Sequence, residues 1–181
     1  MNPPRLFARM SLTMSATRPF LVWIFLAASA SAAPEHPPQT GPTVPGNKAA
    51  VSWGKCAAPE NAPLAVKTAI WAGNYLVGRP DVWGGGHGTF YDRGYDCSGS
   101  ISFLLHHASC LDQPTTSAAL KNFGEPGMGR WITIYARDGH TFAIVCGIRL
   151  DTTGPHGDEG PRWRRNDRGP AGFVARHPPG L

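Results

Sequence analysis

Three kinds of motif are missing from this 181-residue sequence, and each absence argues against a class of function. No two of the four cysteines stand in Cys-x-x-Cys spacing, which argues against a structural zinc site and against a thioredoxin-type redox motif. The glycine-rich stretch 84–88 matches neither the Walker pattern nor the dinucleotide-binding pattern. No internal repeat is present. The length suits one domain, and we expect no cofactor.

A hydrophobic run long enough to cross a membrane comfortably is also missing. The run Phe20–Ala28 is too short, follows three arginines, and is followed by Ala30-Ser31-Ala32, which is typical of signal-peptidase cleavage. We therefore expect residues 1–32 to be a signal peptide, with a retained membrane anchor as the alternative. The protein is then exported, to the periplasm or to the extracellular cell wall, with no stable membrane insertion after cleavage.

Excess positive charge is small once the signal peptide is removed. Residues 1–32 hold three of the 17 Lys+Arg and none of the 12 Asp+Glu, so their loss lowers the net charge from +5 to +2. This charge gives no indication of nucleic-acid binding.

The order of the remaining segments predicts an α+β domain with N-terminal helices packed on an antiparallel β-sheet. Residues 33–50 are proline-rich and are expected to be a linker, which leaves the domain at 51–181, acting as a monomer. Helical spacing predicts helices, and β-branched runs predict strands, with a hairpin pivot at Gly147 and a long loop after Gly154. The predicted helices are 63–76, 97–109 and 117–123, and the predicted strands are 130–135, 140–146, 148–152 and 172–176.

Cys97 is the strongest candidate for a catalytic residue. It follows a glycine-rich turn and begins a helix, where free backbone N–H groups and the helix dipole favour a thiolate. The alternative is an inert buried cysteine, which is common in protein cores. If Cys97 is free, at most one disulfide can form among Cys56, Cys110 and Cys146, and the sequence does not select the pair.

His140 is the candidate base, because a nucleophilic cysteine needs an imidazole and His140 opens a strand. A histidine that only caps a strand is the alternative. Chain reversal at Gly147 would bring Asp151 nearly opposite His140, where a carboxylate can orient the imidazole. The alternative is that Asp151 only forms a turn before Gly154. His156 is the reserve for this third role, and His87 is a second polar group near the thiol. A metal site built from Cys97, His140 and His87 or His156 matches no usual zinc signature.

Three motifs resemble the NlpC/P60 family of cell-wall peptidases over about residues 62–154. They are Trp83-Gly84-Gly85, the segment Gly94-Tyr95-Asp96-Cys97-Ser98-Gly99, and Gly139-His140 leading a β-hairpin. The resemblance implies a permuted papain-like fold in which the cysteine precedes the histidine. It also implies cleavage of peptide bonds in peptidoglycan stem peptides, with Cys97 as nucleophile, His140 as base and Asp151 as the third polar residue. Asp81 departs from the family pattern, since many members have an aromatic hydroxyl two residues before this tryptophan.

The sequence therefore predicts an exported cysteine hydrolase that cleaves amide bonds in peptidoglycan stem peptides through a thioester. We expect substrate to contact Trp83, His87, Ser98 and Trp163. The alternatives are a thiol acyltransferase or amidase acting on a substrate outside the cell wall, and a cell-wall-binding module with weak catalysis.

Overall fold

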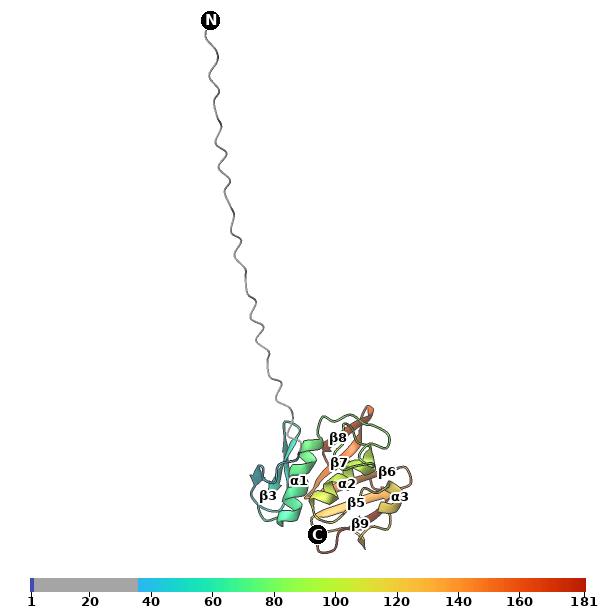
Figure 1. Cartoon of the computed structure of the whole chain (residues 1–181). Coiled ribbons are helices and arrows are strands. Elements are labelled where there is room, and N and C mark those ends of the chain that lie inside the picture. Colours follow the sequence, from blue (N-terminus) through green and yellow to red (C-terminus); the bar gives the residue numbers. More distant parts are fainter. Residues whose placement is uncertain (2–35) are drawn as a thin grey trace. The chain divides into compact units, whose positions relative to one another are not determined.

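The computed structural model describes Met1 and residues 36–181 (Figure 1). The predicted signal peptide lies, apart from Met1, outside the described residues. Within those residues, no helix has the length and hydropathy needed to cross a membrane.

The described chain combines three helices with two sheets, which confirms the α+β prediction. The helices are α1 (Leu64–Leu76), α2 (Cys97–His107) and α3 (Ser117–Leu120). A small sheet has the order β1 (Thr43–Val44), β3 (Lys55–Pro59) and β2 (Ala50–Ser52). A larger antiparallel sheet has the order β4 (Glu125–Pro126), β9 (Val174–His177), β5 (Ile132–Arg137), β6 (His140–Val145), β7 (Ile148–Gly154) and β8 (Gly157–Arg164).

The predicted linker 33–50 is partly folded, so the predicted domain start at Val51 is too late. Strand β1 pairs in parallel with β3, and β2 pairs with β3 in the antiparallel sense. Ala49 is buried and donates its N–H to the carbonyl of Cys146 at 3.0 Å. The proline-rich composition conceals this pairing because proline lacks an N–H but keeps its carbonyl, and the Pro42 carbonyl accepts from Ala58 N–H at 3.0 Å.

Strand β8 lies where the sequence predicts a long loop after Gly154. Its glycines and Pro161 argue against a central strand, yet β8 is the last strand of its sheet, and an edge strand tolerates both residue types. Its pairing with β7 shifts register between Asp151 and Thr153. This edge strand was therefore not predicted, because its glycines and proline obscure the alternation of buried and exposed residues along it.

The predicted hairpin pivot at Gly147 is confirmed. Strands β6 and β7 pair from Val145↔Ile148 onward, and the two turn residues Cys146 and Gly147 have φ of 50° and 87°. Positive φ at both central residues is the geometry of a tight hairpin turn. The turn returns β7 along β6 and so fixes which residues of the two strands share a face.

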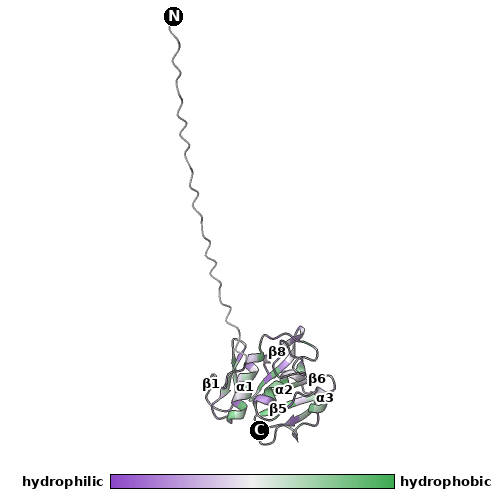
Figure 2. Ribbon diagram, viewed as in Figure 1, coloured by the Kyte–Doolittle hydropathy of each residue, from purple (hydrophilic) through white to green (hydrophobic). Residues whose placement is uncertain are grey.

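Asn74 of α1 links three elements around the core. Its side-chain amide accepts from the Cys56 N–H at 2.7 Å, donates to the Cys56 carbonyl at 2.8 Å, and accepts from the Trp163 indole N–H at 2.9 Å. The Trp163 ring lies against Gly73, where an added Cβ would collide with it. Figure 2 shows apolar colour on parts of α1, α2 and β5, which contribute buried residues to this core.

We expect Asn74→Ala to lower the free energy of unfolding by about 2–4 kcal/mol, because it removes three hydrogen bonds of about 1 kcal/mol each and leaves part-buried polar groups unpaired. Urea unfolding followed by circular dichroism measures the change. The control is Asn122→Ala at an exposed position, expected to change stability by less than about 0.5 kcal/mol. Equal effects of the two substitutions would show that Asn74 does not link these elements.

Candidate active site

The N-terminus of α2 positions the Cys97 thiol. Asp96 is the N-cap residue, and its carboxylate accepts from the Gly99 N–H at 2.7 Å. The same side chain accepts from the Gly84 N–H at 3.1 Å, and the Asp96 N–H donates to the Gly85 carbonyl at 3.2 Å. These hydrogen bonds join the glycine-rich loop 84–88 to the start of α2, whose first residue is Cys97.

Close approach of backbone segments explains the glycines at positions 85 and 99. A Cβ added at Gly99 would collide with the Gly85 carbonyl, and one added at Gly85 would collide with the Gly94 carbonyl. Side chains at these positions would push the loop away from the first turn of α2. The Trp-Gly-Gly and Asp-Cys-Ser-Gly motifs are therefore two halves of one packed unit.

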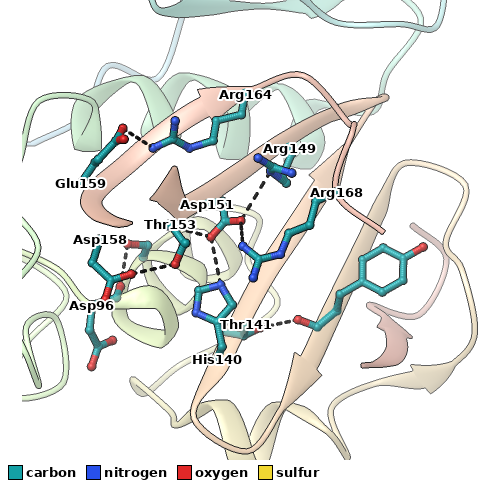
Figure 3. Close-up of polar contacts among 12 residues, drawn as sticks. Asp96, His140, Thr141, Arg149, Asp151, Thr153, Asp158, Glu159, Arg164 and Arg168 are labelled. Atoms are coloured by element: carbon teal, nitrogen blue, oxygen red, sulfur yellow. Dashed lines mark hydrogen bonds and ion pairs between the residues drawn. The ribbon is translucent and has the colours of Figure 1, made fainter. Parts of the chain in front are cut away.

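His140 begins β6 directly after a turn whose Gly139 has a φ of 81°. His140 is 9% exposed, and its Nε2 lies 3.0 Å from Oδ1 of Asp151 on the neighbouring strand β7 (Figure 3). Helix α2 packs against both strands, so the thiol at its first residue faces the imidazole. The structure thus brings together the predicted Cys97, His140 and Asp151.

Opposing effects set the pKa of His140. Burial alone lowers the pKa of the imidazole, but hydrogen bonds to Asp151 and to the Cys97 thiol, with the negative charges of both groups, outweigh it. The result is a pKa raised from 6.5 to about 9. An imidazolium at neutral pH stabilises a thiolate beside it.

Asp151 is 1% exposed, so its carboxylate depends on the donors around it. Oδ1 accepts from the Thr153 N–H at 3.0 Å as well as from His140, and Oδ2 accepts from Arg168 Nη1 at 2.9 Å. Arg149 Nε lies 3.5 Å from Oδ2. Burial alone raises the pKa of Asp151, but these hydrogen bonds and the charges of His140 and Arg168 bring it below its usual value.

A cleft of about 110 Å³ opens beside the thiol and the imidazole. Three carboxylates line it together with Cys97 and His140: Asp81, Asp96 and Asp158. Burial raises the pKa of Asp81, the charges of Asp158 and Asp96 raise it further, and His140 opposes them. Nothing in the sequence pointed to Asp158, because it lies in the segment predicted as a loop.

Three of the predicted substrate contacts surround the thiol. Trp83 lines this cleft and is 94% exposed, and it also lines an adjoining hollow of about 240 Å³. His87 and Ser98 line that second hollow, where His87 Nε2 lies 3.1 Å from both Ser98 Oγ and Asp96 Oδ1. The cleft and the second hollow therefore share Trp83, Asp96 and Ser98 among their lining residues.

Trp163, the fourth predicted contact, is a correction. It is 6% exposed and belongs to the hydrophobic core, with its indole N–H bonded to Asn74. The aromatic residue among arginines looked like a surface feature because the alternation of β8 was not recognised. Its role is packing between β8 and α1.

Neither His156, the reserve for the third role, nor His107 of α2 lines the cleft. His156 is exposed in the turn between β7 and β8, where its N–H donates to Glu159. His107 packs on Phe103 with ring centroids 4.5 Å apart, and burial, with the nearby His106 and His36, lowers its pKa to about 4. Among the described residues, no group of three or more His, Cys, Asp or Glu side chains forms a cluster that could hold a metal ion.

The four cysteines, all within the described residues, are free thiols. Burial raises the pKa of Cys56 to about 12, with a further rise from the charge of Cys146, and burial raises the pKa of Cys146 to about 12. Burial also raises the pKa of Cys110. Of the four, Cys97 lines the cleft.

No protein-family model matches the sequence, and no curated protein matches it. Among solved structures, an NlpC/P60 family protein from Bacillus cereus ATCC 10987 is similar, with a TM-score of 0.48 and 18% sequence identity. The match covers 68% of this chain and 44% of that protein, so the chain spans less than half of its length. The chemistry that the site allows must therefore be derived from its own residues.

The raised pKa of His140 predicts a stability that depends on pH. Because its folded pKa is about 9 against 6.5 when unfolded, its stabilising contribution is complete below pH 6.5 and is lost as pH rises through 9. We expect unfolding in urea to require about 2–3 kcal/mol less at pH 9.5 than at pH 6 through this group. His140→Asn removes this part of the pH dependence, whereas His156→Asn at an exposed turn retains it. The same pH dependence in wild type and His140→Asn would contradict the raised pKa.

Proposed function

We propose that the chain is an exported cysteine hydrolase that cleaves amide bonds in peptidoglycan stem peptides through a thioester on Cys97. One observation carries the proposal: a half-exposed thiol at a helix start faces an imidazole whose other side is bonded to a buried carboxylate. Nucleophile, base and orienting group in this order are the components of thiol-dependent acyl transfer. The adjoining cleft gives a substrate carbonyl access to the thiol.

In the proposed reaction, the Cys97 thiolate attacks the amide carbon and the carbonyl oxygen becomes an oxyanion. Backbone N–H groups at the start of α2 other than that of Gly99, which Asp96 caps, donate to it in this proposal, since a helix leaves its first N–H groups without intrahelical partners. His140 then donates its proton to the leaving nitrogen, the C–N bond breaks, and the acyl group stays on sulfur. Water, deprotonated by His140, attacks the thioester carbon, the C–S bond breaks, and the acyl group leaves as a carboxylic acid. This restores the Cys97 thiolate beside a protonated His140.

The electrostatics of the site fit these steps. With a pKa of about 9, His140 is protonated at neutral pH and can act as the acid for the leaving amine. Asp151 stays ionised because its pKa is lowered, so it stabilises the imidazolium throughout. The hydrogen bond between His140 Nε2 and Asp151 leaves Nδ1 of the imidazole available to the Cys97 sulfur.

The proposed fold is the permuted papain-like arrangement, with membership of the NlpC/P60 family. In its support, the cysteine on helix α2 precedes the histidine on β6, and the carboxylate follows on β7. The motifs Trp83-Gly84-Gly85 and Asp96-Cys97-Ser98-Gly99 pack together at the site. Export by a signal peptide at residues 1–32 belongs to the same proposal.

The substrate class is supported by the charge of the cleft. Three carboxylates face the reacting groups, and such a surface favours a substrate with a free amino group over an anionic one. Stem peptides that contain a diamino acid carry such an amine. We propose that Trp83 supports the peptide backbone and that His87 and Ser98 contact the part lying in the second hollow.

The test is incubation of the purified protein with purified muropeptides, followed by mass spectrometry of the products. We expect cleavage of an amide bond by wild type, none by Cys97→Ser, and a loss of about 10³-fold or more in His140→Ala, the scale of removing a member of a catalytic triad. Cys110→Ser is the matched control and keeps full activity, because that thiol does not line the cleft. Full activity in Cys97→Ser would overturn the proposal, and transfer to an added amine without hydrolysis would identify an acyltransferase.

A further inference from the structure

The loop between β8 and β9 places a guanidinium on the side of Asp151 that does not face His140. Arg168 Nη1 donates to Asp151 Oδ2 at 2.9 Å (Figure 3). The Asp151 side chain is fully buried in this contact, and the Arg168 side chain is 25% exposed. The sequence offered no indication of this pair, which joins residues 17 positions apart.

Two aromatic rings hold the Arg168 guanidinium. Its central carbon lies 5.5 Å from the ring centroid of Phe142 and 5.8 Å from that of Phe173. These rings are 5.1 Å apart, and Phe173 also lies 6.1 Å from the His140 ring in an edge-on contact. Both distances lie within the range of cation–π attraction, so the two rings hold the guanidinium in place. Arg168 and His140 are thus fixed by one aromatic surface.

Within the described residues, Arg168 is the arginine that hydrogen-bonds Asp151. Arg149 lies near the same oxygen, but its Nε is 3.5 Å away and has no hydrogen-bond partner. Its Nη1 instead donates to Asp167 at 3.2 Å. With Oδ2 taken by Arg168, the other oxygen of Asp151 is directed to His140 and the Thr153 N–H.

The arginine also counteracts the carboxylate. An unpaired buried Asp151 would stabilise a positive charge on His140 strongly, and an imidazolium held too tightly is a poor proton donor. A cation on the far oxygen offsets part of that negative charge. The other charged or titratable groups near His140 come from every element around it: Cys97 from α2, Asp96 at the N-cap of α2, Asp81 from the loop after α1, Arg137 from β5, Arg149 from β7 and Asp158 from β8.

We propose that Arg168 is a positioning residue that holds the Asp151 carboxylate with Oδ1 toward His140 and limits how strongly this carboxylate stabilises the His140 imidazolium. Its effect on turnover rests on the proposed hydrolase function. Its effect on the titration of His140 does not, and the two are measured separately.

The test compares Arg168→Gln with Arg165→Gln, which removes the same charge from an exposed position of the same loop. The NMR titration of the His140 ring, assigned with His140→Asn, needs no substrate. We expect its midpoint to rise by about one pH unit in Arg168→Gln, the lower end of what one neighbouring charge causes, and to stay at the wild-type value in Arg165→Gln. Arg168→Lys keeps the cation, so its His140 midpoint is expected to lie close to the wild-type value. If Arg168→Gln is unstable, Arg168→Met gives the same comparison, since its apolar side chain suits the surface of Phe142 and Phe173.

On a substrate that wild type cleaves, Arg168→Gln is expected to lower kcat by about tenfold or more with little change in KM, as for other residues that orient a catalytic ligand through a second group. If the His140 midpoint is unchanged in Arg168→Gln and in Arg168→Met, the inference is overturned, whatever the activity of these variants. A shifted midpoint in a protein that cleaves no peptide supports the inference and contradicts the proposed function instead.

Discussion

The buried carboxylate of Asp151 is the constraint around which this site is organised. A fully buried carboxylate is tolerated only when hydrogen-bond donors and cations surround it. Here they come from separate parts of the chain: His140 on β6, Thr153 on β7 and Arg168 on the loop before β9. Strands β6 and β7 must therefore be neighbours, and the loop after β8 must return over them. The β7–β8 pairing shifts register between Asp151 and Thr153, two residues that also share a hydrogen bond at this carboxylate.

A second constraint, steric rather than electrostatic, places the thiol. The glycine-rich loop 84–88 approaches the first turn of α2 so closely that a Cβ at Gly99 would collide with the Gly85 carbonyl. The Asp96 carboxylate joins the two segments by hydrogen bonds to the N–H groups of Gly84 and Gly99. Helix α2 then packs on β6 and β7, so its first residue meets the imidazole. The buried Asp151 carboxylate thus positions His140 on the sheet, and the glycine-rich loop positions Cys97 at the start of α2. The cleft lined by three carboxylates lies where these two residues meet.

The sequence predicted those parts that local physics determines. Pro63 before an amphipathic run marked α1, the glycine turn marked the start of α2, and Gly147 marked the β6–β7 turn, from which the pairing of His140 with Asp151 followed. It did not predict features that depend on distant partners. Strand β1 owes its conformation to pairing with β3, and β8 is a strand because β7 offers it an edge, despite its glycines and proline. Trp163 was misplaced for that reason, and Arg168 reaches Asp151 through a loop with no periodicity to read.

The central claim is that Cys97 carries an acyl group during turnover. Intact-protein mass spectrometry after rapid acid quenching of the protein with a stem peptide tests it most directly, because a thioester survives in acid and adds the mass of the acyl fragment. We expect this added mass on the intact protein and, after digestion, on the peptide that contains Cys97. We also expect it to be absent in Cys97→Ser and to decay on the time scale of product release. Product formation by wild type with no adduct at any time, together with an undiminished rate in Cys97→Ser, would contradict it.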